Sequence, residues 1–178
     1  MSEFTIEIFD KNKIDEYKKH EKLVIKSWGN LTDCGYSFFE FSELKEVEIK
    51  DWENVTDCCY MFLYNENLQS VTLPNSWEKV TNCCGMFSGC INLKTIKLPK
   101  FWDKVTNCNY MFYKCAELNN FKIPDCWKPV NSCCDMFAGR GCMYVFTNED
   151  KMNFPKNWNC NNVILVNDAV RTIDNLFN

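Results

Sequence analysis

Histidine is nearly absent from this chain, whose 178 residues include only His20. Ser/His/Asp and Cys/His catalytic sites need a histidine that faces a nucleophile. His20 lies in a charged stretch, and nothing in the sequence places a nucleophile beside it. A glycine-rich phosphate-binding loop is also missing. The sequence therefore predicts a protein that is not an enzyme.

The chain also lacks a long apolar run and a basic excess. No stretch reaches the roughly 18 apolar residues of a membrane-spanning helix. The net charge of −4 and the pI near 5.1 do not suggest the basic face of a nucleic-acid binder. Glu3 stands where a secretory signal would be basic and then apolar. We therefore expect a cytoplasmic chain, with the cell surface as the alternative if a signal has been removed.

Cysteine is abundant, with 13 residues, but no two cysteines have the C-x-x-C spacing. Zinc sites usually use such pairs or cysteine–histidine sets, so we expect neither a metal nor another cofactor. Disulfide scaffolds are usually shorter than about 80 residues and poor in core. Here 46% of the residues are hydrophobic, 15% are aromatic and the cysteine count is odd. These features favour a cysteine-rich chain with mostly free thiols in a reducing compartment.

What the sequence does contain is an internal repeat of 25 residues. Its marker is a cysteine followed three and four places later by Met-Phe, and the four copies start at Cys58, Cys83, Cys108 and Cys133. A tryptophan stands six places before each of these cysteines, and an earlier, degraded copy starts at Trp28. A unit this short cannot bury its own apolar face, so the copies must stack into a solenoid with a continuous core.

The end of each repeat has the two-residue period of a strand. In the second full copy Ile96 and Leu98 alternate with Thr95 and Lys97, and Pro99 follows. We expect the apolar pair to point inward, the polar pair outward, and the proline to end the strand. Stacked copies then form a parallel sheet.

The repeated cysteines and tryptophans can each be interpreted as core residues or as functional ones. The cysteine column is interpreted as small buried filler, with a metal site or thiol redox chemistry as alternatives. In the vicinal pairs, such as Cys58-Cys59, both thiols cannot point inward, so one of each pair is expected to lie shallow and oxidisable. The tryptophans are expected to stack on one another within the core, although the same column could stack sugars.

The string F-x-x-C-x-x-L-x-x-I-x-L-P, read here from Phe87 to Pro99, resembles the BspA-like leucine-rich repeat and the related bacterial surface-protein repeat of about 25 residues. The resemblance covers roughly residues 28 to 146. It implies an open, right-handed, leucine-rich-repeat-like solenoid, β-rich with parallel strands and short helical turns, which binds other molecules through its surface. The column that contains Cys58 departs from that pattern, because it holds cysteine throughout where an aliphatic residue or methionine is expected.

We predict one solenoid domain spanning residues 1–178. Residues 1–27 are expected to form an N-terminal cap, residues 28–137 the repeats, and residues 138–178 an irregular last turn and a C-terminal cap. In the last part, Gly139 to Pro155 is interpreted as an altered turn with a protruding loop, and Val163 to Val166 as a short strand before a final helix. Such caps cover the ends of an open stack.

The predicted binding surface combines the outward strand columns with the 139–155 loop. A strip that passes from acidic to basic could orient a protein partner, although it could equally be ordinary solvated sheet surface. We therefore predict a protein-binding module, with an inhibitor or immunity-type protein that neutralises a toxin or enzyme, or a surface adhesin, as alternatives. The partner and the oligomeric state stay open. The candidate residues are Glu46, Glu48, Ser70, Thr72, Thr95, Lys97, Asn120, Lys122, Arg140 and Tyr144.

Overall fold

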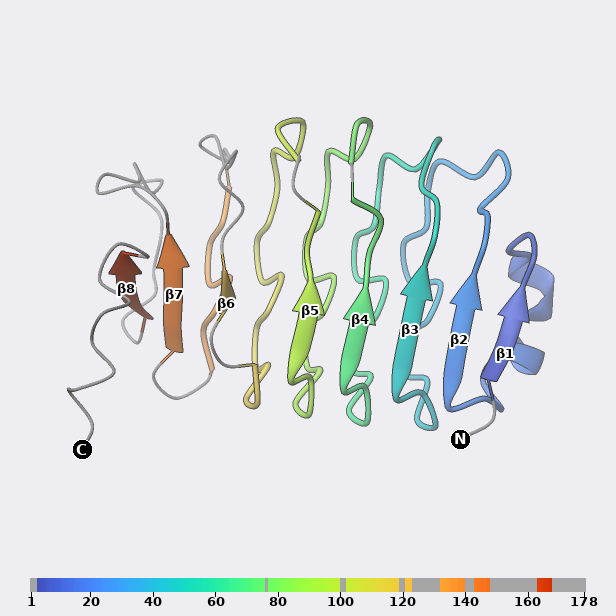
Figure 1. Ribbon diagram of the computed structural model, residues 1–178, viewed down its shortest axis with the longest axis horizontal. Coiled ribbons are helices and arrows are strands. Elements are labelled where there is room, and N and C mark those ends of the chain that lie inside the picture. Colours follow the sequence, from blue (N-terminus) through green and yellow to red (C-terminus); the bar gives the residue numbers. More distant parts are fainter. Residues whose placement is uncertain are drawn as a thin grey trace.

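The computed structural model describes residues 3–75, 77–99, 102–118, 121–122, 132–139, 143–147 and 163–167, with the backbone alone for 121–122 and the last two ranges. The strands lie side by side and point in the same direction along a stack (Figure 1). This arrangement, with little helix, confirms the predicted parallel-strand solenoid. In chain order the elements are β1 (Glu3–Ile6), η1 (Lys11–Lys13), α1 (Ile14–Tyr17), β2 (Lys22–Ile25), β3 (Glu46–Ile49), β4 (Ser70–Thr72), β5 (Thr95–Lys97), β6 (Phe121–Lys122), β7 (Met143–Thr147) and β8 (Val163–Asn167).

Two parallel sheets contain these strands, one in the order β1-β2-β3-β4-β5 and one in the order β6-β7-β8. The register of the first sheet places Val47 opposite Val71 and Val71 opposite Ile96. Val47 and Val71 are buried and Ile96 is partly buried against the same core, so the predicted alternation is confirmed. β1 and β2 continue this sheet from the stretch that the sequence assigned to the N-terminal cap.

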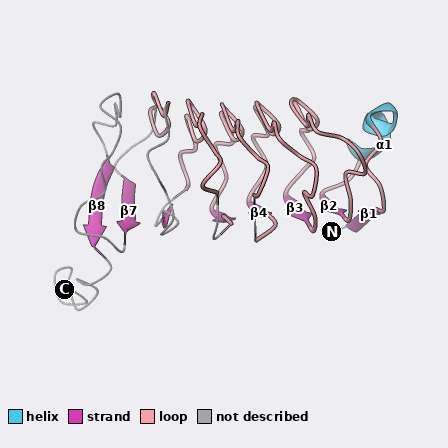
Figure 2. Cartoon of the chain, turned by 90° about the horizontal axis from the view of Figure 1, so that it is seen from above, coloured by secondary structure: helices cyan, strands magenta, loops and turns pink. Residues whose placement is uncertain are grey.

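A second set of backbone hydrogen bonds joins the coils on the side opposite the strands. Figure 2 shows strands along one long side of the stack and loops along the other. Across two neighbouring coils the amide of Tyr60 donates to the carbonyl of Cys84 over 2.8 Å, and that of Phe62 to Met86 over 2.9 Å. Between them, the amide of Met61 donates within its own coil to Cys58. We call this element the turn ladder; it comprises residues 34–40, 58–64, 83–89, 108–114 and 133–139.

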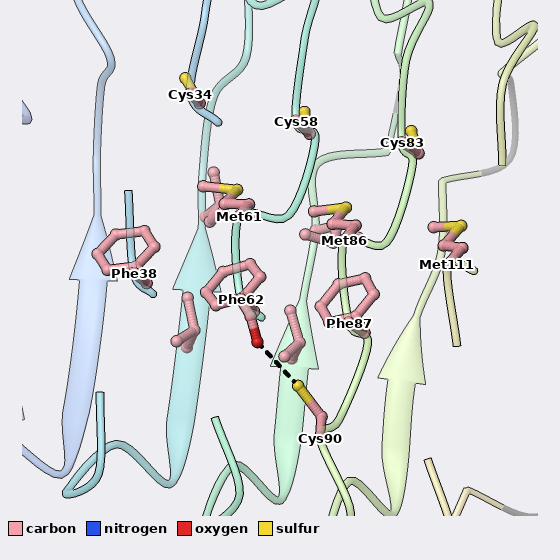
Figure 3. Packing of buried hydrophobic residues seen from close by; sticks show 14 of the residues in the cluster. Cys34, Phe38, Cys58, Met61, Phe62, Cys83, Met86, Phe87, Cys90 and Met111 are labelled. Carbon is pink, nitrogen blue, oxygen red and sulfur yellow. Dashed lines mark hydrogen bonds between the residues drawn. The ribbon is translucent and has the colours of Figure 1, made fainter. Parts of the chain in front are cut away.

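The core consists of identical side chains stacked from coil to coil (Figure 3). The rings of Phe62 and Phe87 lie 5.3 Å apart with an angle of 6° between their planes, and those of Phe87 and Phe112 lie 5.5 Å apart at 3°. The methionines of the four Met-Phe pairs are fully buried. The pairs therefore line one internal row, as the repeat predicts.

The tryptophans form a second internal row. The rings of Trp52 and Trp77 are 5.1 Å apart, and those of Trp77 and Trp102 are 5.7 Å apart. Trp28 lies at the start of this row and packs against Phe9 at 4.4 Å. All four are at most 5% exposed. They cannot stack a sugar from solvent, so the prediction of a core stack is confirmed.

A hydrogen-bond donor recurs at one buried position of three successive coils, where it holds the backbone of the preceding coil. The Asn65 amide donates to the carbonyl of Phe38 over 2.6 Å. At the equivalent positions the thiols of Cys90 and Cys115 donate to the carbonyls of Phe62 and Phe87 over 3.1 and 3.0 Å. These two cysteines are therefore both core residues, as predicted, and weak hydrogen-bond donors.

The last part of the repeat region differs from the prediction in one respect. Met143–Thr147, which the sequence placed in a protruding loop, forms β7 and pairs with β6 and β8. The loop prediction is wrong for these residues because Met-Tyr-Val-Phe-Thr is rich in aromatic and β-branched side chains, which favour a strand. The strand predicted at 163–166 is confirmed as β8. The remainder of the 139–155 loop beyond Gly139, and the final helix, lie outside the described residues.

Candidate binding surfaces

The outward residues of β3, β4 and β5 form a regular array, which we call the strand face. In register, Glu46 lies opposite Ser70, which lies opposite Thr95. The second column runs from Glu48 through Thr72 to Lys97. Side chains on β3 and β4 are half-buried, whereas Thr95 and Lys97 are exposed. The predicted columns are thus brought together, and their most accessible end is at β5.

Ion pairs reduce the acidic character of the opposite end of this face. Lys22 of β2 lies 2.8 Å from the Glu3 carboxylate and 3.8 Å from that of Glu46. The hydrogen bond and the charge of Glu3 raise the pKa of Lys22. Glu48 is paired with Lys50. In the part of the chain that is described, Lys97 has no such partner, so the charge at the β5 end of the strand face is basic.

The remaining predicted residues are not placed on this array. Lys122 lies in β6 of the second sheet, where its backbone is opposite Phe146. Tyr144 lies in β7 opposite Ile164 of β8. Asn120 and Arg140 lie outside the described residues. Residues of the strand face and those of the second sheet therefore belong to separate hydrogen-bonded sheets.

Sequence reasoning missed a second surface, the turn face, which is the outer side of the turn ladder. Tyr36 and Tyr64 are 53% and 48% exposed there. The Tyr36 ring lies 5.2 Å from that of Tyr60 and 6.1 Å from that of Phe39, which is 6.4 Å from Tyr64. These aromatic residues stand two, five and six places after the repeated cysteine. That recurrence was the available signal, but the positions also hold Gly85 and Gly89, which hide it.

The turn face also carries the outer member of each vicinal cysteine pair. Cys59, Cys84 and Cys134 are half-buried, whereas Cys58, Cys83 and Cys133 are fully buried, which confirms that one thiol of each pair lies shallow. The Cys84 thiol donates to the Tyr60 hydroxyl over 3.6 Å. This contact is the main reason that the pKa of Tyr60 is raised to about 12. Burial, and then the neighbouring Cys84 thiol, raise the pKa of Cys59 to about 12.

The inner cysteine column behaves as apolar filler. Burial raises the pKa of the Cys58 and Cys83 thiols well above the ordinary value, and that of Cys34 to about 12. A buried, protonated thiol is a poor nucleophile, because the thiolate is the reactive form. The described residues hold no group of three or more His, Cys, Asp or Glu side chains arranged for a metal ion.

The family follows from the repeat itself. The family model of the BspA type leucine-rich repeat region matches residues 58–167 as six copies. The chain belongs to the BspA-type leucine-rich repeat family. Repeats of this family commonly mediate protein–protein interaction or occur in surface proteins, and they are generally not enzymes. Comparison with curated proteins and with solved structures gave no match.

The match and the geometry differ in where the BspA-type repeats begin. The degraded copy, with Ser37 in place of methionine, precedes the matched residues. Its coil nevertheless joins the turn ladder, because the amide of Phe38 donates to the carbonyl of Met61 over 2.9 Å. The rings of Phe38 and Phe62 are stacked 5.2 Å apart.

No helix in the described part of the chain has the length and apolar character of a membrane span.

Proposed function

We propose that this chain is a non-enzymatic protein-binding module that uses the strand face, with the 139–155 segment as an adjoining contact. The observation that carries the proposal is the exposed end of that face at Thr95 and Lys97. Parallel pairing of β5 with β4 holds these side chains in register with Ser70 and Thr72. A partner therefore meets a preorganised row, which lowers the entropy lost on binding.

The charge of the strand face favours a partner with an acidic patch. Glu48 is paired with Lys50 and Glu46 shares Lys22 with Glu3, whereas Lys97 is exposed without an ion pair among the described residues. A carboxylate placed over β5 would meet Lys97 beside the hydroxyls of Thr72 and Thr95. Such complementarity contributes mainly to specificity and to the rate of association.

Charge reversal at β5 tests the proposal. We expect Lys97→Glu to weaken a captured protein partner by about tenfold, which corresponds to about 1.4 kcal/mol. Thr95→Trp probes the same place by size without adding charge and should also weaken binding. Lys104→Glu is the matched control, since Lys104 is exposed but lies outside the strands. The partner is captured from native lysate with the unmodified chain, identified by mass spectrometry, and titrated against each variant.

The comparison among variants decides the outcome. Loss of affinity in the two β5 variants with retention in the control supports the strand face. Equal affinity of all four proteins for the captured partner would remove this face from the interaction. Thermal unfolding of each variant separates a lost contact from a lost fold.

Display on a bacterial surface is a second candidate, and family membership favours it because BspA-type repeats are typical of bacterial surface proteins. In that case the strand face would bind a molecule outside the cell. Antibody labelling of intact and permeabilised cells distinguishes the two locations. Labelling that requires permeabilisation would contradict surface display.

A further inference from the structure

Cys59 and Cys84 occupy the same position in adjacent coils of the turn face. We propose that they form a dithiol site that closes reversibly to a disulfide across the two coils. This inference goes beyond the binding function, because it concerns a covalent modification site on the opposite side of the stack (Figure 2). It rests on the register of the coils, on the accessibility of the two thiols and on the residues beside them.

The spacing of the two coils suits a disulfide. The Tyr60 amide, directly after Cys59, donates to the Cys84 carbonyl over 2.8 Å. In these same two coils the rings of Phe62 and Phe87 are 5.3 Å apart, so equivalent residues are separated by about that distance. Disulfides join residues whose Cα atoms lie about 4.4–6.8 Å apart. The thiols already influence each other, since the Cys84 thiol contributes to the raised pKa of Cys59.

The column that contains these two residues has no other adjacent pair of cysteines among the described coils. It reads Gly35, Cys59, Cys84, Asn109 and Cys134. Cys134 is half-buried like the other two. The equivalent residue in the preceding coil is Asn109, whose side-chain oxygen accepts a hydrogen bond from the Cys134 amide over 2.6 Å. Cys134 therefore resembles the proposed pair in burial, but among the described residues the adjacent coil has no cysteine at the same position.

Accessibility separates the proposed pair from the inner thiols. Cys58 and Cys83 are fully buried, and a soluble oxidant cannot reach them while the chain is folded. Cys59 and Cys84 are half-buried on the turn face, where the Cys84 thiol also contacts the Tyr60 hydroxyl. The two thiols are equally half-buried, so either can attack the oxidant first. In one order of events Cys84 attacks first and Cys59 second, and the reverse order gives the same disulfide.

A low-molecular-weight disulfide, such as glutathione disulfide, supplies the oxidising equivalents. The Cys84 thiolate attacks one sulfur of the oxidant, forms a mixed disulfide and releases one glutathione thiol. The Cys59 sulfur then attacks the Cys84 sulfur, breaks the mixed disulfide and releases the second glutathione thiol. The two cysteines together lose two electrons and two protons, which leave with the two glutathione molecules. An excess of reduced glutathione reverses the sequence.

The experiment treats the intact, folded chain with glutathione disulfide, blocks the remaining thiols and maps tryptic peptides by mass spectrometry. We expect a linkage between peptides 51–79 and 80–94, with no gain of glutathione mass on either. Fragmentation of the linked peptides places the bond at Cys59 and Cys84 rather than at their vicinal neighbours. Dithiothreitol should release both peptides.

Three variants identify the roles of the two thiols. Cys59→Ser should stop at the mixed disulfide, with glutathione retained on Cys84. Cys84→Ser should likewise lose the cross-link, with glutathione retained on Cys59. The matched control Cys134→Ser should form the cross-link at the same rate as the unmodified chain. Near-UV circular dichroism confirms that each variant is folded.

Thermal unfolding provides a measurement that does not depend on mapping. The disulfide closes a loop of about 25 residues and restricts the unfolded chain, so the oxidised protein should have a Tm at least about 5 °C higher. This shift should be absent from Cys59→Ser and Cys84→Ser. A folded protein that accumulates only glutathione adducts, links other cysteines or leaves both peptides unmodified would overturn the proposal.

Discussion

At the scale of single residues, two polar side chains are buried in the otherwise apolar interior of the repeats. Ser37 stands in the degraded copy where the other coils have methionine, and its hydroxyl is buried without a hydrogen-bond partner. Asn65 is just as deeply buried and its side-chain oxygen also lacks a partner, but its amide nitrogen donates to the Phe38 carbonyl. A buried polar group without a partner costs about 1–3 kcal/mol, whereas a paired one stabilises the fold. Equal burial therefore has opposite consequences at these two positions.

This contrast predicts opposite effects of two alanine substitutions. Ser37→Ala should raise the free energy of unfolding by about 1 kcal/mol, because it removes a hydroxyl that lost its water on folding. Asn65→Ala should lower it by about 2 kcal/mol, because it removes the donor to Phe38 and leaves a cavity. Equilibrium urea denaturation measures both values. A clear loss of stability in Ser37→Ala would show that the hydroxyl has a partner.

At the scale of elements, the turn ladder holds a backbone that residues other than glycine rarely adopt. Its third residue has a positive φ in each coil, including 54° at Tyr60 and 55° at Tyr110. Gly85 occupies the same position with φ of 56°. Since tyrosine is accepted there in other coils, the backbone angle alone does not demand glycine. Glycine is required because there is no space for a side chain. A Cβ on Gly85 would lie 2.1 Å from the Tyr60 ring, which covers Gly85.

Gly85→Ala should therefore destabilise the protein chiefly through this contact. We expect the free energy of unfolding to fall by about 2 kcal/mol, within the range found for overpacked sites. In a Tyr60→Ala background the same substitution should cost less than half as much, because the ring is gone. A double-mutant cycle by urea denaturation measures this coupling. An equal cost in both backgrounds would assign the effect to the backbone angle instead.

The sequence predicted the strands better than the turn ladder, for a physical reason. A strand with one buried face leaves a two-residue alternation, as in Thr95 to Leu98, that can be read directly. The turn ladder leaves no such alternation, because residues with a positive φ recur four places apart within it, as at Tyr60 and Tyr64. These residues interrupt the two-residue period of an extended chain. The strand at 143–147 was missed for a different reason, since the repeat register is interrupted just before it.

At the scale of the whole molecule, the repeat period was enough to predict which residues share a column. It placed Glu46, Ser70 and Thr95 in one row, as the register confirms. It did not predict the ion pair between Lys22 and Glu46, because β1 and β2 precede the recognisable repeats. The charge of a solenoid face therefore depends on strands that carry no repeat signature, and the acidic end predicted from the columns is partly neutralised.

The inner thiol column also predicts how the stability of the whole molecule depends on pH. Burial raises the folded-state pKa of its members above the ordinary value of 9.0. Below about pH 9 these thiols are protonated in both the folded and the unfolded chain, so they do not make the free energy of unfolding depend on pH. Above that pH the unfolded thiols ionise while the folded ones keep their protons, so stability falls as pH rises. The affected residues are Cys34, Cys58, Cys83, Cys90 and Cys108.

Each such thiol should lower the free energy of unfolding by about 1.4 kcal/mol per pH unit above pH 9. Native domains have a free energy of unfolding of only about 5–15 kcal/mol. Several thiols acting together should therefore unfold the chain cooperatively between about pH 9.5 and 11. Urea denaturation from pH 7 to 10.5 in the presence of a reductant measures the slope. Cys83→Ala should be less stable at pH 7 but show a shallower slope above pH 9, because one titrating group is missing. A stability that stayed level from pH 8.5 to 10.5 would mean that the column is open to solvent, contrary to the continuous core on which the solenoid depends.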